Sequence, residues 1–147
     1  MRYIDTNLVS GENVVARAHL HWTLFLGPCL VAALFFPIVV LLRMPLLLFF
    51  PVLALVHAWI EYRTSEFAVT NKRVLLKIGC IRRKSEELLL TKVEGIQVTQ
   101  DIPGRLLGYG SVRVTGTGGS HDPYHRISRP LEFRRHVQEQ VALVQGS

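Results

Sequence analysis

The sequence predicts an α+β membrane protein, in which a two-helix transmembrane hairpin precedes a small antiparallel β domain closed by a C-terminal helix. Three observations support this: two long uncharged apolar runs, short alternating segments after them, and a last segment with helical apolar spacing. A chain of 147 residues has no soluble core that could hide about forty consecutive apolar positions.

The apolar runs are Trp22–Leu42 and Met44–Ile60, separated by Arg43. At about 1.5 Å per residue the first spans roughly 30 Å as a helix, which matches the hydrocarbon core of a bilayer. The second is shorter, and prolines at 28, 37, 45 and 51 kink both. Two crossings are therefore favoured over a shallow re-entrant hairpin, which stays open, and over a signal peptide or a buried soluble hairpin.

Basic residues set the expected orientation of this hairpin. Arg43 stands alone at the turn, whereas Arg17 precedes the first run and Arg63 follows the second, with more basic residues after it. Because basic residues near the ends of spans stay in the cytoplasm, both termini are expected there. Trp22 and Trp59 fall at the cytoplasmic ends of the runs, where amphipathic rings favour the headgroup level.

The formal net charge of +6 fits a surface facing anionic headgroups. Nucleic-acid binding is not expected, because neither a recognition helix nor exposed aromatic residues accompany the basic ones. Cys29 lies in the first run and Cys80 in a cytoplasmic turn, so the two thiols are expected to stay reduced.

From residue 62 to 147 the pattern becomes that of one small cytoplasmic domain, preceded by a lead-in at 1–21. Apolar and polar residues alternate, which predicts strands at 66–69, 73–78, 81–90, 96–99, 112–115 and 124–127. Loops are expected at Ile102–Arg105 and Thr117–Ser120. Residues 13–20 alternate loosely and fit either a strand or an interfacial helix.

The final segment, 130–144, predicts one amphipathic helix. Its apolar residues recur at spacings of four, four and three from Phe133 to Val144. Ser128 is the expected cap and Pro130 lies in the first turn. Several strands and one terminal helix indicate a strongly bent sheet or barrel with the helix plugging an open end.

Five ordered strings carry a resemblance to a known family: Ser65–Val74, Lys92–Val98, Gly104–Gly110, Thr115–Gly119 and Pro130–Phe133. In these the chain resembles bacterial pleckstrin-homology-like (PH-like) domains of the type that follows membrane spans. The resemblance covers about residues 64–140 and also touches the lead-in and spans. It implies a PH-like β-barrel or sandwich capped by the C-terminal helix, at the bacterial inner membrane, and it does not imply an enzyme.

The candidate ligand- or lipid-binding residues are the basic ones around the predicted β-turns: Lys72, Arg73, Arg82, Arg83, Lys84 and Arg105. They could bind anionic headgroups. The alternative is a solvated hairpin that only follows the positive-inside bias, and for Arg105 a contact that holds its turn.

No other chemistry is predicted. The pairs His19/His21 and His121/His125 lack a third ligand at a suitable spacing, so neither a metal site nor a cofactor is expected. His57 lies near the end of the second run and is expected to be a neutral interfacial imidazole. No catalytic triad or convergent carboxylate pair is visible, and the chain is expected not to be an enzyme.

Two hypotheses about function follow. The first is a non-catalytic, membrane-anchored module that scaffolds a protein assembly, through strand addition or loop docking. The second is a lipid-handling role, in which the basic loops bind anionic headgroups. Membrane lipids and either a second copy or another membrane protein are the expected partners, since small residues such as Gly27, Ala32 and Ala33 permit close helix contact.

Overall fold

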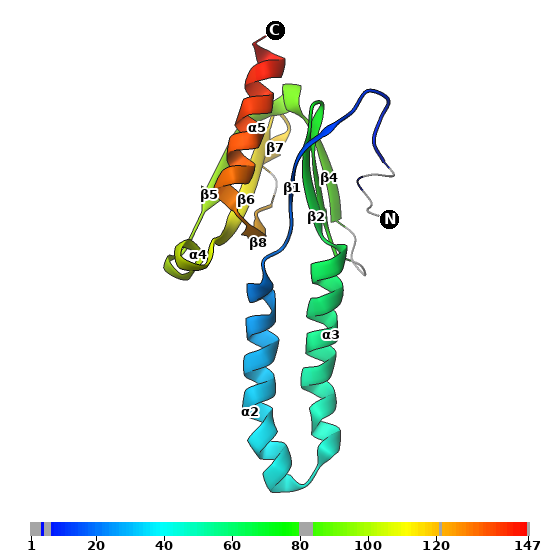
Figure 1. Ribbon diagram of the computed structural model, residues 1–147, viewed down its shortest axis with the longest axis vertical. Coiled ribbons are helices and arrows are strands. Elements are labelled where there is room, and N and C mark those ends of the chain that lie inside the picture. The colour runs from blue at the N-terminus through cyan, green and yellow to red at the C-terminus, as the bar shows by residue number, and fades with distance from the viewer. Residues whose placement is uncertain (1–3, 5–6, 80–83, 121, 147) are drawn as a thin grey trace.

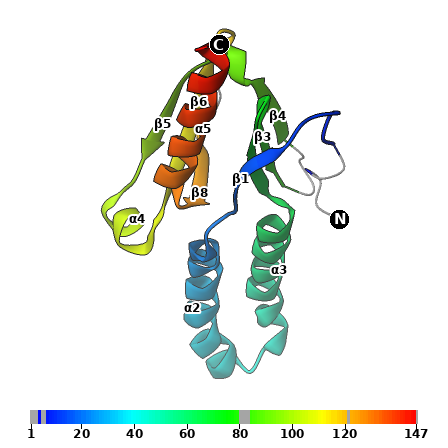
Figure 2. The same cartoon turned by 45° about the horizontal axis from the view of Figure 1, so that its top comes forward.

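Two apolar helices extend from one end of a β domain that has its own core (Figure 1). The computed structural model describes residues 4, 7–79, 84–120 and 122–146. Figure 2 shows the same arrangement after a rotation, with the helix pair projecting away from both sheets.

The hairpin begins with a 3-10 turn, η1 (Trp22–Phe25), which continues as helix α2 (Leu26–Leu42). Arg43 ends α2 in the left-handed conformation, at φ 51°, and its N–H donates to the carbonyl of Val39. A second 3-10 turn, η2 (Pro45–Leu48), leads into α3 (Phe49–Thr64). By length and composition alone, Trp22–Leu42 and Pro45–Thr64 could each cross a membrane, with mean hydropathies of 2.6 and 1.6.

The strands of the first sheet come both before and after the helix hairpin in the sequence. It has the order β1-β2-β3-β4, with β1 Val14–Ala18, β2 Glu66–Thr70, β3 Arg73–Ile78 and β4 Lys84–Leu89, all antiparallel. Because β1 precedes the hairpin and β2 follows it, the two helices leave the sheet from neighbouring strands. The undecided lead-in is therefore a strand.

The second sheet holds β5 (Val93–Thr99), β6 (Tyr109–Gly116) and the short β7 (Gly119–Ser120), and β8 (Tyr124–Ser128) also pairs with β6. The chain after β1 joins the two sheets. Leu20 forms a bridge with Ile127, and the N–H of His21 donates to the carbonyl of Arg126 at 2.7 Å. Within the described residues the sheets do not close into a barrel, so the barrel of the predicted fold class is not observed.

One core lies between the sheets and under helix α5 (Pro130–Gln145). The helix contributes Phe133 and Val137, which are buried with residues from both sheets. Phe67 of β2 and Tyr124 of β8 meet edge to face, with ring centroids 5.7 Å apart, and so link the sheets across the core. The predicted C-terminal helix is therefore present and closes the domain.

The opposite face of the first sheet is also covered. Ala68 and Leu75 point away from the main core, as alternation requires, yet both are buried with Ile4 in a second small cluster. Leu8 and Val14 pack against that cluster. The residues before the hairpin therefore act as part of the domain.

Several local predictions were wrong. The loop expected at Thr117–Ser120 ends in the short strand β7, which pairs with β6. The expected loop at Ile102–Arg105 is a short helix, α4 (Ile102–Leu107), which ends at Gly108 in the left-handed conformation. The N-cap of α5 is Arg129, at φ 50° and without a side-chain cap bond, and not Ser128. Another 3-10 turn, η3 (Leu90–Lys92), connects β4 to β5.

Candidate interaction surfaces

The helix pair presents apolar side chains outward over most of its length. Among the described residues of α2 and α3, only Val39, Pro51 and Ala58 are buried. Leu34 and Leu41 are 69% and 83% exposed. Contiguous apolar surface of this kind marks an interaction with a membrane or another protein.

The predicted basic β-turn at Lys72 and Arg73 lies far from these helices. Strand β2 begins at Glu66, two residues after α3 ends at Thr64, and runs away from the helix pair (Figure 1). At about 3.3 Å per residue, a five-residue strand places the turn before β3 roughly 17 Å further on. Lys72 and Arg73 are therefore at the end of the sheet opposite to the hairpin.

Both of these cations hold the N-terminal segment. The Nζ of Lys72 donates to the carbonyl of Ser10 at 2.9 Å. The Nε of Arg73 donates to Oε1 of the buried Glu12 at 2.9 Å, and its Nη2 donates to the carbonyl of Asn7 at 2.7 Å. Arg73 also pairs with the more exposed Glu87. The guanidinium is therefore largely occupied within the chain.

Glu12 lies at the centre of these contacts, and we call its interaction with Arg73 the Glu12 clasp. Its carboxylate also accepts a bond from the hydroxyl of Thr70 at 2.7 Å and one from the N–H of Val9 at 2.8 Å. The hydrogen bond from Arg73 lowers the pKa of Glu12 from 4.5 to about 2, against the opposing effect of burial. The same bond raises the pKa of Arg73. Together these contacts form a structural ion pair.

The other predicted ligand residues either lie near the end of the domain that carries α2 and α3 or fall outside the described residues. Arg82 and Arg83 lie outside the described residues. The strand ends that flank them, Ile78 and Lys84, pair with each other and lie toward the α3 end of the sheet. Arg105 is exposed on α4, at the same end. A ligand role for these residues stays a prediction.

A groove runs between β5 and α5, where the second sheet ends. Strand β5 is hydrogen-bonded to β6 and has no other neighbouring strand among the described residues. The cavity beside it, of about 230 Å³, is lined by residues 93–96 of β5 and by Val137, Gln138, Val141 and Ala142 of α5. Near the end of α5, the side-chain amide of Gln145 donates to the carbonyl of Val93 at 3.1 Å and so ties the helix to β5. An open strand edge beside an apolar groove suits an extended peptide.

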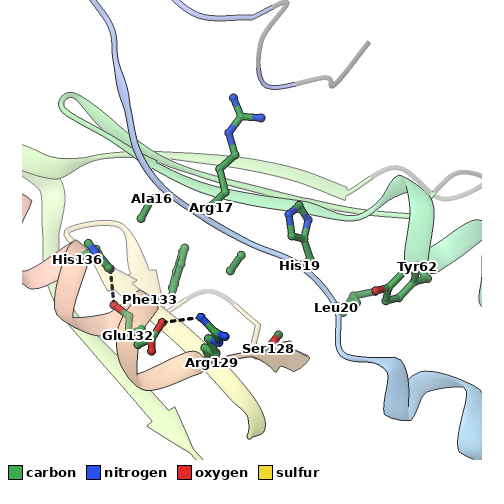
Figure 3. A pocket seen from close by; sticks show the side chains of 11 residues that line it. Ala16, Arg17, His19, Leu20, Tyr62, Ser128, Arg129, Glu132, Phe133 and His136 are labelled. Atoms are coloured by element: carbon green, nitrogen blue, oxygen red, sulfur yellow. Dashed lines mark hydrogen bonds and ion pairs between the residues drawn. The ribbon is translucent and has the colours of Figure 1, made fainter.

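Two further cavities flank the root of the hairpin. One, of about 360 Å³, lies between the β1–Leu20 segment and the start of α5 (Figure 3). In Figure 3, Arg17 and His19 point away from the α5 side, while Arg129 points toward Glu132, 3.7 Å away. The charged side chains around this cavity are thus paired or turned apart.

The other root cavity, of about 610 Å³, lies between the helix pair and the second sheet. Leu24 and Glu61 line it from the helices, and Asp101, His125 and Arg126 line it from the domain. Arg126 is held at φ 57°, a conformation that is uncommon outside glycine, at the irregularity where β8 pairs with β6. The cavity is open and polar, and we assign no ligand to it.

The histidines do not form a cluster in the described part of the chain. His21 is buried, which lowers its pKa below the ordinary value, and its Nδ1 accepts from the N–H of Thr23 at 3.3 Å. His125 bonds Ser111 instead, and His121 lies outside the described residues. Among described residues, no three His, Cys, Asp or Glu side chains converge. The expected lack of a metal stays a prediction.

Sequence reasoning missed α4 and the Glu12 clasp. The signals for α4 were present, because Asp101 stands at the cap position, Pro103 in the first turn and Gly108 after the last residue. The clasp had no comparable signal, since Glu12 and Arg73 are 61 residues apart.

The chain matches a known protein family over most of its length. A family model described as Bacterial PH domain matches residues 22–141, which includes both apolar helices. No curated protein and no solved structure matches the chain.

Proposed function

Since the chain belongs to the bacterial PH domain family, whose members are protein- or lipid-interaction modules, we propose that it is a membrane-anchored, non-catalytic docking module. In this proposal the hairpin spans the bacterial inner membrane with both termini in the cytoplasm. The domain then receives an extended segment of a partner protein in the groove between β5 and α5.

The exposed surface of the helix pair supports the anchoring. Two helices alone bury few of their own side chains. Near the domain the rings of Phe25 of η1 and Tyr62 of α3 meet at 5.5 Å, but most apolar side chains along α2 and α3 stay exposed. The acyl chains of a bilayer give such an apolar surface a favourable environment, so no further protein is needed to cover it. The single basic residue at the turn, Arg43, belongs on the far side under the positive-inside bias.

The groove between β5 and α5 carries the docking part of the proposal. Strand addition uses main-chain groups for affinity and side-chain pockets for specificity. Strand β5 offers the first, and the half-buried Val141 and the exposed Ala142 offer the second. The elements that line the groove, β5 and α5, lie on the domain away from the helix pair, so a cytoplasmic partner could reach the groove (Figure 2).

The test is site-specific photo-cross-linking of the full chain in native membranes. A photoreactive residue at the exposed Glu94 is expected to capture one defined partner protein. Ala142→Arg, which fills the groove, should abolish that product, whereas Leu143→Arg, one position outside the groove lining, should leave it. A product that survives Ala142→Arg, or no product, would contradict docking in this groove.

Binding of anionic headgroups is the second candidate, and the helix-side position of Arg105 favours it. This position would place the cation near the bilayer surface, where each basic residue contributes about 1 kcal/mol of attraction. Lys72 is at the opposite end. The selectivity of the reconstituted chain for spin-labelled phosphatidylglycerol over phosphatidylcholine should fall in Arg105→Glu and not in Lys72→Glu. Equal selectivity in the wild-type chain, Arg105→Glu and Lys72→Glu would rule out headgroup binding by Arg105.

A further inference from the structure

Helix α4 presents two large apolar side chains to its surroundings. Ile102 and Leu106 are 79% and 83% exposed, although most apolar side chains of the domain are buried. A spacing of four places them on the same face of the helix. A soluble surface gains nothing from this pair, so the face is expected to have an occupant.

The attachment of α4 fixes which face is outward. Gly104 is buried, and a Cβ there would lie 2.6 Å from the carbonyl oxygen of Tyr109. Gln100 donates to that same oxygen at 2.9 Å, and Gly108, at φ 78°, donates to the carbonyl of Gly104. Ile102 and Leu106 are each two residues from Gly104, about 200° around the helix, and so lie opposite the attached face.

The position of α4 indicates the occupant. Both views place it at the end of the domain from which α2 and α3 project (Figures 1 and 2). Tyr109, which follows α4, contacts the ring of His21 at 5.4 Å between centroids, and His21 immediately precedes Trp22, the first residue of the first apolar helix. The helix is therefore connected to the point at which the chain would enter a bilayer.

We propose that α4 is an interfacial foot, with Ile102 and Leu106 inserted at the boundary between headgroups and acyl chains. The occupant is the lipid surface, because the foot continues the apolar surface of the anchor and carries Arg105, whose long side chain can reach the headgroups. Together with the two roots of the hairpin, the foot gives the domain a third contact with the bilayer and limits its tilt. This inference rests on the anchoring proposed above.

The test measures the surroundings of nitroxide labels on the full chain in phosphatidylcholine–phosphatidylglycerol vesicles. Cys29 and Cys80 are replaced by serine, and single cysteines are introduced as Leu106→Cys, Leu34→Cys and Leu143→Cys. Leu34 lies within α2, and Leu143, 65% exposed on the last turns of α5, is the matched control. Collision with oxygen, which concentrates in lipid, is compared with collision with a water-soluble nickel chelate.

The foot predicts that the oxygen-to-nickel ratio at 106 is several-fold above that at 143 and closer to that at 34. If the label at position 106 gave the same ratio as the label at position 143, while the label at position 34 lay in lipid, the interfacial foot would be contradicted and the anchoring would stand. A label at 106 shielded from both reagents would show a protein occupant and overturn it too. A label at 34 exposed to nickel would overturn the anchoring and the foot together.

Discussion

The helix hairpin and the β domain use the same kinds of apolar side chain in opposite ways. In the domain, Phe67 is fully buried among residues from both sheets and α5, whereas in α2 Phe36 is 61% exposed. The domain supplies its own apolar surroundings, and the hairpin does not. The difference is what the proposed anchoring requires, because apolar side chains that the chain itself does not cover are stabilised by an external apolar phase.

The most direct test of this difference between the regions is to truncate a phenylalanine in each and compare the loss of domain stability. Phe67→Ala leaves a cavity in the core and should lower the free energy of unfolding of the domain by about 4 kcal/mol. Phe36→Ala should change it by less than about 0.5 kcal/mol, because Phe36 contacts no part of the domain core. Pulse proteolysis of both variants in urea, in detergent micelles, measures the difference. Equal effects would contradict the separation.

The clasp between Glu12 and Arg73 gives the next largest effect. Glu12→Gln leaves the guanidinium without its buried carboxylate and should cost about 3 kcal/mol of domain stability. Glu87→Gln removes the more exposed partner of Arg73 and should cost no more than about 1 kcal/mol. The same proteolysis assay measures both. If the two losses were alike, the buried ion pair with Glu12 would stabilise the domain no more than the exposed pair with Glu87.

Acid should remove the stabilisation that this clasp provides. The pKa of Glu12 is about 2 in the folded chain and 4.5 ordinarily, so its contribution is complete above about pH 4.5 and is lost as the pH falls toward 2. The shift corresponds to about 3 kcal/mol. The stability difference between the wild-type chain and Glu12→Gln should therefore shrink as the pH is lowered. A difference that does not change with pH would contradict the assigned ion pair.

A smaller effect is expected where α4 is attached. Gly104→Ala places a Cβ against the carbonyl of Tyr109 and should cost about 1 to 2 kcal/mol, or shift α4 outward. Gly118→Ala, at a glycine with no neighbouring atom within 4 Å, is the matched control and should be close to neutral. Hydrogen exchange at residues 102–110 would detect a shift that the unfolding free energy does not show. Unchanged exchange and stability would mean that α4 is loosely held.

Local sequence patterns predicted the elements well and their long-range contacts poorly. Uncharged runs identified the helices, and alternation identified the strands, because each pattern reports the period of one element. The pairing of β1 with β2 across the whole hairpin has no local signal, and neither does the cover that Ile4 gives to Ala68 and Leu75. Alternation along β3 places Leu75 on the face opposite to Val74 and Leu76, but it cannot show what lies on that face.

The candidate binding residues illustrate the same limit. Charge and turn chemistry selected Lys72 and Arg73, yet both hold the N-terminal segment at the end of the sheet remote from the hairpin. Charge alone does not distinguish a cation that is free to bind from one that has an internal partner. The groove beside β5 depends on the placement of α5, which no spacing in the sequence specifies.

The placement of the hairpin in lipid is tested most directly by labelling intact cells with a membrane-impermeant maleimide. The chain carries Arg43→Cys or Lys72→Cys, with Cys29 and Cys80 replaced by serine. If the hairpin crosses the membrane with both termini in the cytoplasm, position 43 is labelled in intact cells and position 72 is labelled only after the membrane is permeabilised. Labelling of both positions only after permeabilisation would contradict a hairpin that crosses the membrane.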